Sequence, residues 1–169
     1  MTRTGKRRAV YPGSFDPVTY GHLDLIQRAL TVFDEVVVAV ARNIGKTPCF
    51  TLQERVGMLK RATRSLGGVT VEAFNGLVVD YVRRKECRIV VRGLRMISDF
   101  EYEFQMALTN RKLDRGVETL FLMPSENYAY LSSRLIKEAS ALGADVSAFV
   151  PPFVAAALKR KLRSKSRLS

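Results

Sequence analysis

The residues best suited to chemistry lie together in one short segment, from Tyr11 to His22. It contains two glycines, the hydroxyl side chains of Ser14 and Thr19, and the only histidine of the chain. Apolar residues precede it at strand spacing, and residues 23–33 follow it at helical spacing, which predicts a strand-to-helix connection. Because the N–H groups at a helix start favour anions, and because glycine lets the main chain approach a ligand, the segment predicts a phosphate site.

His22 falls in the first turn of this predicted helix, where its ring would face a bound phosphate. A solitary histidine is more often a structural residue whose hydrogen bonds are satisfied within the fold. The anion-binding position of His22 favours the functional interpretation, since it gives the ring a ligand to contact.

The rest of the chain alternates apolar, strand-like runs with segments of helical periodicity. Predicted strands cover 9–11, 35–41, 69–74, 88–91 and 118–123, and predicted helices cover 23–33, 51–66, 77–86, 99–114, 132–142 and 152 onward. Thr51 opens the second helix with a capping box, Gly67 and Gly68 end it, and Ser98 caps the fourth. The pattern predicts an α/β fold, a single doubly wound Rossmann-like domain over residues 1–169 with a five-stranded parallel sheet.

The unusual polar segments all follow predicted strands. They cover 12–22, 43–48, 74–78, 92–98 and 124–133. In a doubly wound fold the carboxyl ends of the strands lie at one edge of the sheet, and ligands bind there. These segments are therefore expected to build one site.

Composition restricts the class of protein. A chain of 169 residues that is 47% hydrophobic can bury one substantial core. The sequence contains no membrane-spanning run and no signal segment, so a cytoplasmic location without membrane contact is expected. Two cysteines and one histidine support neither a disulfide framework nor a zinc site.

The net charge of +12 raises the question of nucleic acid. Ten basic residues lie in short extensions at 1–8 and 159–169, which contain no acids, so twelve minus ten leaves +2 for the body. Residues after Leu158 are expected to form a frayed helix end and a solvated tail. Incidental solubility or weak polyanion contact is favoured over specific nucleic-acid recognition.

Several motifs in order along the chain resemble bacterial pantetheine-phosphate adenylyltransferase, a family of nucleotidyltransferases. They are the segment 12–22 with its Thr-x-Gly-His, Lys46-Thr47-Pro48, Arg92-Gly93-Leu94-Arg95, the acidic helix start 99–103, and 128–138 with its paired serines. The resemblance covers nearly the whole chain. Tyr20 and Thr47 depart from the residues that are commonest in the family, which are a small polar residue and a second basic residue.

The resemblance implies transfer of the adenylyl group of ATP to 4'-phosphopantetheine, which gives 3'-dephospho-CoA and pyrophosphate. This is the penultimate step of coenzyme A biosynthesis. The residue types agree, because such a transfer needs positioning and charge neutralisation more than a covalent nucleophile. Mg2+ is implied as a cofactor held mainly by ATP phosphates, since no carboxylate cage stands out. A homohexamer and feedback inhibition by coenzyme A are implied as well.

The resemblance also implies roles for particular residues. His22, Lys46 and Arg92 would be catalytic, with His22 donating a hydrogen bond to the α-phosphate. Ser14, Lys46, Val78 and Arg92 would bind phosphopantetheine. The implied ATP-binding residues are Ser14, Phe15, His22, Gly93, Leu94, Arg95, Glu103, Tyr128, Ala129, Tyr130, Leu131, Ser132, Ser133 and Arg134.

Other interpretations stay open at this point. Lys46 and Arg92 could be surface cations, Ser132 and Ser133 could only cap a helix, and Leu77 and Val78 could equally be core residues. The main alternative enzyme is a transferase of the same fold that acts on nicotinamide mononucleotide or glycerol phosphate. The alternative from another class is a basic nucleic-acid-binding protein.

Overall fold

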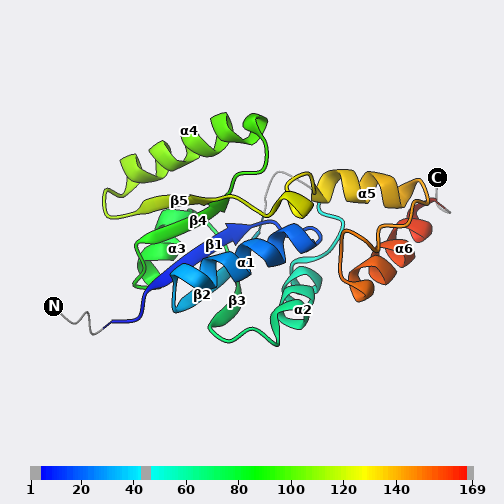
Figure 1. The fold of residues 1–169 in the computed structure, drawn as a ribbon, viewed down its shortest axis with the longest axis horizontal. Helices are drawn as coiled ribbons and strands as arrows, with labels where there is room; N and C mark the ends of the chain where they lie inside the picture. The colour runs from blue at the N-terminus through cyan, green and yellow to red at the C-terminus, as the bar shows by residue number, and fades with distance from the viewer. Residues whose placement is uncertain (1–4, 43–46, 167–169) are drawn as a thin grey trace.

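The computed structural model describes residues 5–42 and 47–166, and the elements alternate as the sequence predicts. In chain order they are β1 (Arg8–Gly13), α1 (Tyr20–Val32), β2 (Glu35–Ala41), α2 (Leu52–Thr63), β3 (Val69–Phe74), α3 (Val78–Arg84), β4 (Ile89–Gly93), α4 (Ile97–Leu113), β5 (Glu118–Leu122), the 3-10 turn η1 (Glu126–Tyr128), α5 (Ser133–Ala141) and α6 (Pro152–Ser166). Figure 1 shows their arrangement.

The strands form one five-stranded parallel sheet in the order β3-β2-β1-β4-β5. The predicted α/β class is confirmed. The chain runs outward from β1 to β3, then returns to place β4 on the other side of β1, where Val10 pairs with Val90. Strand order reverses between β1 and β4, so a ligand is expected at the carboxyl ends of these two strands.

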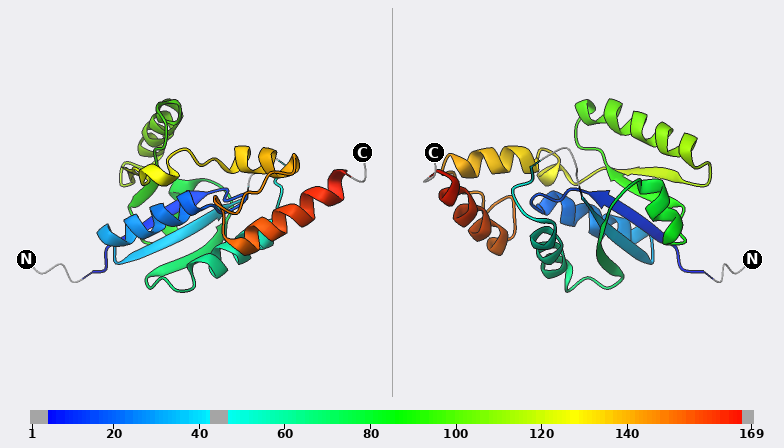
Figure 2. Two further views of the ribbon diagram at one scale, coloured as in Figure 1. Left: turned by 45° about the vertical axis from the view of Figure 1, so that its right-hand side comes forward. Right: turned by 180° about the vertical axis from the view of Figure 1, so that it is seen from behind.

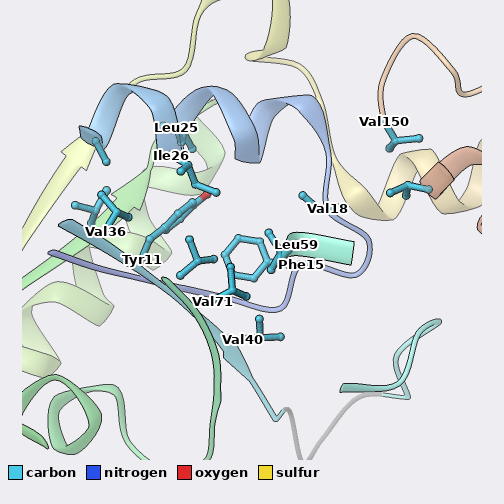
Figure 3. Close-up of a cluster of buried hydrophobic side chains, with 14 of the residues drawn as sticks. Tyr11, Phe15, Val18, Leu25, Ile26, Val36, Val40, Leu59, Val71 and Val150 are labelled. Atoms are coloured by element: carbon cyan, nitrogen blue, oxygen red, sulfur yellow. The ribbon is translucent and has the colours of Figure 1, made fainter. Parts of the chain in front are cut away.

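Alternating side chains of β1 enter two cores, one on each face of the sheet. Tyr11 belongs to a cluster that includes Phe15, Leu25 and Leu59 (Figure 3) and that extends over residues of α1, α2 and α6. Val10 points to the other face and packs with residues of α3, including Val82. Burial on both faces explains the valine-rich runs of the central strands.

The helices lie on both faces of the sheet and at its carboxyl end. Helices α5 and α6 lie beyond one end of the sheet, next to the start of α1 (Figures 1 and 2). Helix α4 runs along β5 at the side of the sheet (Figure 1). The buried face of α1 is made by Leu25, Ile26 and Ala29, which fix its N-terminal turn beside β1.

Two predicted helix boundaries are wrong. Ser98 does not cap α4, because the helix begins at Ile97 after an extended Met96, and the N–H of Asp99 already closes a turn onto the Met96 carbonyl at 3.0 Å. Helix α2 ends at Thr63, short of Gly67. The capping box at Thr51 is confirmed, since Thr51 and Glu54 exchange hydrogen bonds.

The prediction of a frayed end after Leu158 is also wrong, because α6 continues to Ser166. Lys161 explains part of this continuation, since its ammonium donates to Glu54 of α2 at 2.8 Å and lies over the Phe50 ring. Within the described residues, no helix combines the length and the apolar character needed to cross a membrane.

Candidate active site

A cavity of about 480 Å³ opens at the carboxyl edge of the sheet, where β1 and β4 end. Its walls come from the segments after β1, β2, β4 and β5, and from the starts of α1, α4 and α5. The segment 74–78 after β3 contributes no lining residue. The cavity therefore lies at the point of strand reversal, as expected for this topology.

Most of the residues predicted from the sequence meet in this cavity. They are Ser14, Phe15, His22, Arg92, Gly93, Arg95, Glu103, Leu131, Ser132, Ser133 and Arg134. Lys46 lies outside the described residues. Leu94, Tyr128, Ala129, Tyr130 and Val78 do not line the cavity.

Three of the predicted residues that do not line the cavity have other contacts in the fold. Val78 packs against the core cluster under α3. The N–H of Leu94 donates to the Leu122 carbonyl at 3.0 Å, which extends the pairing of β4 with β5. The ring of Tyr128 lies 6.1 Å from the ring of Tyr20.

The local structure of α1 fixes both the position and the proton of His22. Thr19 is the N-cap, and its hydroxyl accepts the His22 backbone N–H at 3.3 Å. In return, the Thr19 backbone N–H donates to His22 Nδ1 at 3.0 Å. His22 thus takes the capping-box position usually held by Glu or Gln. Because Nδ1 must accept this bond, the neutral ring carries its proton on Nε2.

The surroundings keep the His22 ring uncharged. Burial, followed by the positive charges of Arg95 and Arg92, lowers the pKa of His22 to about 3. The Phe15 ring packs edge-on against the imidazole, with centroids 5.0 Å apart. At neutral pH the site therefore presents a fixed hydrogen-bond donor at Nε2, with no second proton to lose.

We expect the His22 ring of the unliganded protein to show no titration from about pH 8 to about pH 5, because its pKa lies well below the ordinary value. The chain has one histidine, so a single set of imidazole signals in an NMR titration answers the question. The nitrogen shifts should report the Nε2–H tautomer. A midpoint near the ordinary histidine pKa would contradict the structure.

The same shift makes stability depend on pH. Below its ordinary pKa of 6.5 the histidine of the unfolded chain takes up a proton, whereas the folded ring does not until about pH 3. The contribution of His22 to the free energy of unfolding is thus present above pH 6.5 and is lost as the pH falls toward 3.

Arg92, at the end of β4, is held in one orientation by three hydrogen bonds. Its Nε donates to Glu103 Oε2 at 2.7 Å, Nη2 donates to Glu103 Oε1, and Nη1 donates to the Pro12 carbonyl at 2.5 Å. Burial acts to lower the pKa of Arg92, but Glu103 outweighs it, and the pKa is raised. A guanidinium has five N–H groups, so two remain for a ligand in this cavity.

Arg95 is oriented in a similar way, by groups from two elements. Its Nη1 donates to the Leu131 carbonyl at 2.6 Å, and its Nε donates to Asp99 of α4 at 3.1 Å. The two arginines place two fixed positive charges near the uncharged His22 ring. The cavity is therefore suited to an anion with several phosphate groups.

Ser132 and Ser133 lie at the N-terminus of α5, facing the same cavity. Ser132 is the N-cap residue, but its side chain makes no capping hydrogen bond. Ser133 Oγ donates to the Pro17 carbonyl at 2.9 Å. The structure thus does not support the interpretation that Ser132 only caps the helix, and the first turn of α5 contributes residues to the cavity wall.

Two glycines are required by close packing inside the site. A Cβ at Gly93 would lie 2.3 Å from a methyl of Leu25, and one at Gly13 would lie 2.9 Å from the Phe15 ring. Gly13 therefore makes room for Phe15, which itself packs against His22. This packing role is additional to the prediction that Gly13 lets the main chain approach a phosphate.

Other lining residues had no individual role assigned from the sequence. They are Tyr11, Asp16, Thr19, Leu25, Thr47, Pro48, Arg55, Asp99 and Lys137, among others. Asp16 and Lys137 stand inside the motifs already singled out, so their charge was an available signal. No feature of the sequence indicated that Arg55 lines the cavity, because nothing about an arginine in a helix indicates that it will be only 3% exposed.

Comparisons with known proteins find relatives that match most of this chain. A family model described as cytidylyltransferase-like matches residues 10–139. A phosphopantetheine adenylyltransferase from Caldanaerobacter subterraneus is 52% identical over 157 residues, which cover 93% of this chain and 98% of that protein. One from Geobacter sulfurreducens is 52% identical over 159 residues, which cover 94% and 97%.

Solved structures share the fold at low sequence identity. A Vibrio parahaemolyticus protein described as a nicotinate-nucleotide adenylyltransferase superposes with a TM-score of 0.70 at 16% identity, covering 94% of this chain and 95% of that one. A bifunctional NMN adenylyltransferase/ADP ribose pyrophosphatase from Francisella tularensis gives 0.63 at 14% identity, covering 86% and 44%. These likenesses concern the architecture alone.

Proposed function

This chain belongs to the phosphopantetheine adenylyltransferase family, and from that premise we propose that its cavity transfers the adenylyl group of ATP to 4'-phosphopantetheine. The products are 3'-dephospho-CoA and pyrophosphate. The observation that carries the proposal is the neutral His22 ring, whose Nε2–H is fixed by the Thr19 N–H in a cavity lined by Arg92 and Arg95.

The reaction needs no covalent intermediate on the protein. An oxygen of the 4'-phosphopantetheine phosphate attacks the α-phosphorus of ATP, a new P–O bond forms, and the bond to the bridging oxygen of the β-phosphate breaks. The electron pair leaves with pyrophosphate. His22 Nε2–H donates to an α-phosphate oxygen as negative charge develops on it. A neutral imidazole suits this role, because its Nε2–H stabilises the developing charge by a hydrogen bond and the reaction transfers no proton to or from the ring.

Positive groups reduce the repulsion between the two phosphates. Arg92 supports the reacting phosphate of phosphopantetheine with the two N–H groups that Glu103 and Pro12 leave over. Lys46, outside the described residues, stays a prediction for the same phosphate. On the ATP side we assign Arg95, Ser132 and the N-terminus of α5.

Mg2+ fits this site through ATP. Within the described residues, no group of three histidine, cysteine or carboxylate side chains could hold a metal ion. The cavity carboxylates already pair with cations: Asp16 with Lys137, Asp99 with Arg95, and Glu103 with Arg92. The ion is therefore expected on the phosphates and water, where it would neutralise charge on the leaving pyrophosphate.

The test of the proposed function is product formation from ATP, Mg2+ and 4'-phosphopantetheine, followed by mass spectrometry and pyrophosphate release. We expect dephospho-CoA only when both substrates are present. Nicotinamide mononucleotide and glycerol 3-phosphate, offered in place of phosphopantetheine, should give no adenylylated product. Turnover of either in preference to phosphopantetheine would overturn the proposed substrate.

We also expect the chain to work as a homohexamer, as the family resemblance implies, and helix α4 has an uncovered apolar stripe that could form contacts between copies. Phe100, Phe104 and Leu108 follow one another at intervals of four residues, each 46–47% exposed, and the two phenylalanine rings stack at 5.5 Å. Exposed apolar patches of this kind mark interaction surfaces. Inhibition by coenzyme A at the active-site cavity and a cytoplasmic location stay predictions.

The α4 stripe gives a testable prediction for assembly. Light scattering should find six times the 19.0 kDa chain, about 114 kDa, for the unmodified protein. Phe104→Glu should shift it to smaller species, because a charge cannot be buried in an apolar contact without a large cost. Arg115→Glu, a charge change at an exposed loop residue, is the control. An unchanged mass for Phe104→Glu would exclude this stripe as an interface.

A further inference from the structure

Asp16 connects three elements that line the cavity. It follows β1, and its carboxylate is 7% exposed. Oδ1 accepts the Phe50 N–H at 2.9 Å, and Oδ2 accepts the Cys49 N–H at 2.9 Å. The same Oδ2 accepts from the Lys137 ammonium of α5 at 2.7 Å. Both carboxylate oxygens are therefore occupied by donors from outside the β1 loop.

Neighbouring bonds join the same elements. Arg55, at the start of α2, donates to the Ser14 carbonyl at 2.6 Å and to the Phe50 carbonyl at 3.2 Å. Ser133 of α5 donates to the Pro17 carbonyl at 2.9 Å. The segment 14–17 is thus tied on one side to residues that lead into α2, and on the other side to the N-terminus of α5.

The two connected walls serve different substrates in the proposed function. Thr47 and Pro48 line the cavity just before Cys49, on the side assigned to phosphopantetheine. Ser132 and Ser133 begin α5, on the side assigned to ATP phosphates. An in-line reaction depends on the separation of these two walls, and an error of about 1 Å in such positioning can cost about a hundredfold in rate.

The negative charge of Asp16 explains why its ion pair with Lys137 must be intact. Asp16 lines a cavity that is built for anions, so its negative charge opposes phosphate binding unless Lys137 compensates for it. Lys137 lies one helical turn after Ser133, on the side of α5 that faces the cavity. The ion pair lets a carboxylate organise the walls without repelling the substrates.

We propose that Asp16 is a positioning residue for adenylyl transfer that holds the 47–50 wall through its bonds to Cys49 and Phe50, and the α5 wall through Lys137, in register. This inference rests on the proposed function. Asp16 does not contact the reacting atoms in this role.

The test compares Asp16→Asn, Lys137→Met and the double variant with the unmodified protein. Asparagine has an NH2 group in place of one carboxylate oxygen. This donor then faces another donor, either a backbone N–H or the Lys137 ammonium, and the hydrogen bond there is lost. We expect each single variant to lose about 10- to 100-fold in kcat/KM, the range for a broken charge-assisted bond. In Lys137→Met the KM for ATP should rise most, because Asp16 is left uncompensated.

The double variant separates a coupled pair from two independent residues. If Asp16 and Lys137 act as a coupled pair, the double variant should lose less than the product of the two single losses, because the uncompensated charge of Lys137→Met is gone and only the bonds to Cys49 and Phe50 stay weakened. Losses that multiply would overturn the proposal. Lys137→Arg, which keeps the cation, should recover most of the activity of Lys137→Met. If it does not, a role through charge is excluded.

A structural role alone would lower Tm and leave kcat and KM unchanged, which would also overturn the proposal. Asp34→Asn is the matched control, since Asp34 likewise accepts a backbone N–H and an arginine, from Arg7 at the opposite end of the sheet. It should leave kinetics unchanged.

One readout does not depend on the reaction. Hydrogen exchange of the Phe50 amide should accelerate in Asp16→Asn, because its acceptor is weakened, and unchanged exchange would count against the connection itself. The two hypotheses also fail differently. No product from the unmodified protein would refute the proposed function, whereas product formation with unaltered kinetics in Asp16→Asn would refute only the positioning role.

Discussion

Replacing His22 by alanine should lower kcat for dephospho-CoA formation by about 10²- to 10³-fold, the usual effect of deleting one donor to a developing oxyanion. The reason is that Nε2–H is held in place by the Thr19 N–H, so no other side chain presents a donor from that point of α1. KM for ATP should change much less, because the α-phosphate contact strengthens in the transition state. Steady-state kinetics with both substrates varied would measure the two effects.

Alanine also removes the capping box, so stability must be separated from chemistry. His22→Gln is the matched variant, because glutamine at this position of a capping box can still accept the Thr19 N–H. We expect His22→Ala to lose about 1 kcal/mol of unfolding free energy, and His22→Gln to lose less. Both should lose activity to a similar extent. A variant of either kind that keeps kcat within a few-fold would show that His22 is a structural residue.

Replacing Arg92 by alanine should abolish both activity and a large part of the stability. Glu103 is 8% exposed and receives two bonds from Arg92. Breaking a buried ion pair by removing one partner costs about 3–5 kcal/mol, because the remaining charge has no compensation. The Pro12 carbonyl at the end of β1 loses its donor as well. Urea unfolding and kcat/KM measured on the same preparations would separate the two losses.

Companion variants assign the effect of Arg92. Arg92→Lys should recover little activity, since a lysine cannot form the two-pronged contact with Glu103. The double variant Arg92→Ala, Glu103→Ala should be more stable than Arg92→Ala alone, because no buried charge is left.

Arg83 donates by Nε and Nη2 to Asp114 in a similar but exposed pair. Arg83→Ala should therefore cost much less stability than Arg92→Ala, and no activity. Normal kcat/KM in Arg92→Ala would remove this residue from the site.

Parts of the fold could be predicted because they depend on short stretches of sequence. The valine-rich run of β2 predicts a strand buried on both faces, and the Thr51 capping box predicts the start of α2. Both depend on neighbours a few residues apart. The start of α4 was predicted wrongly, because Leu94 pairs with Leu122 and Met96 stays extended. That boundary is set by a strand that lies far away in the sequence.

The candidate site likewise has a part that could be predicted from the sequence and a part that could not. The motifs placed His22, Arg92 and Ser132 at one edge of the sheet, since parallel strands bring their carboxyl ends together. They could not reveal that Glu103 orients Arg92, or that Asp16 and Lys137, 121 positions apart, form a pair. Side-chain partners across elements depend on distances of a few ångströms that no local pattern contains.

By itself, the sequence determined the parallel α/β architecture, the edge of the sheet where the cavity opens, and the family, because periodicity and motif order are local and cumulative. Only the tertiary structure decided the protonation state of His22. Its tautomer follows from the Thr19 N–H, and its lowered pKa follows from burial and from Arg95 and Arg92, which another strand brings close. Proton affinity depends on the electric field and solvation at one point in space, and the folded chain alone creates that environment.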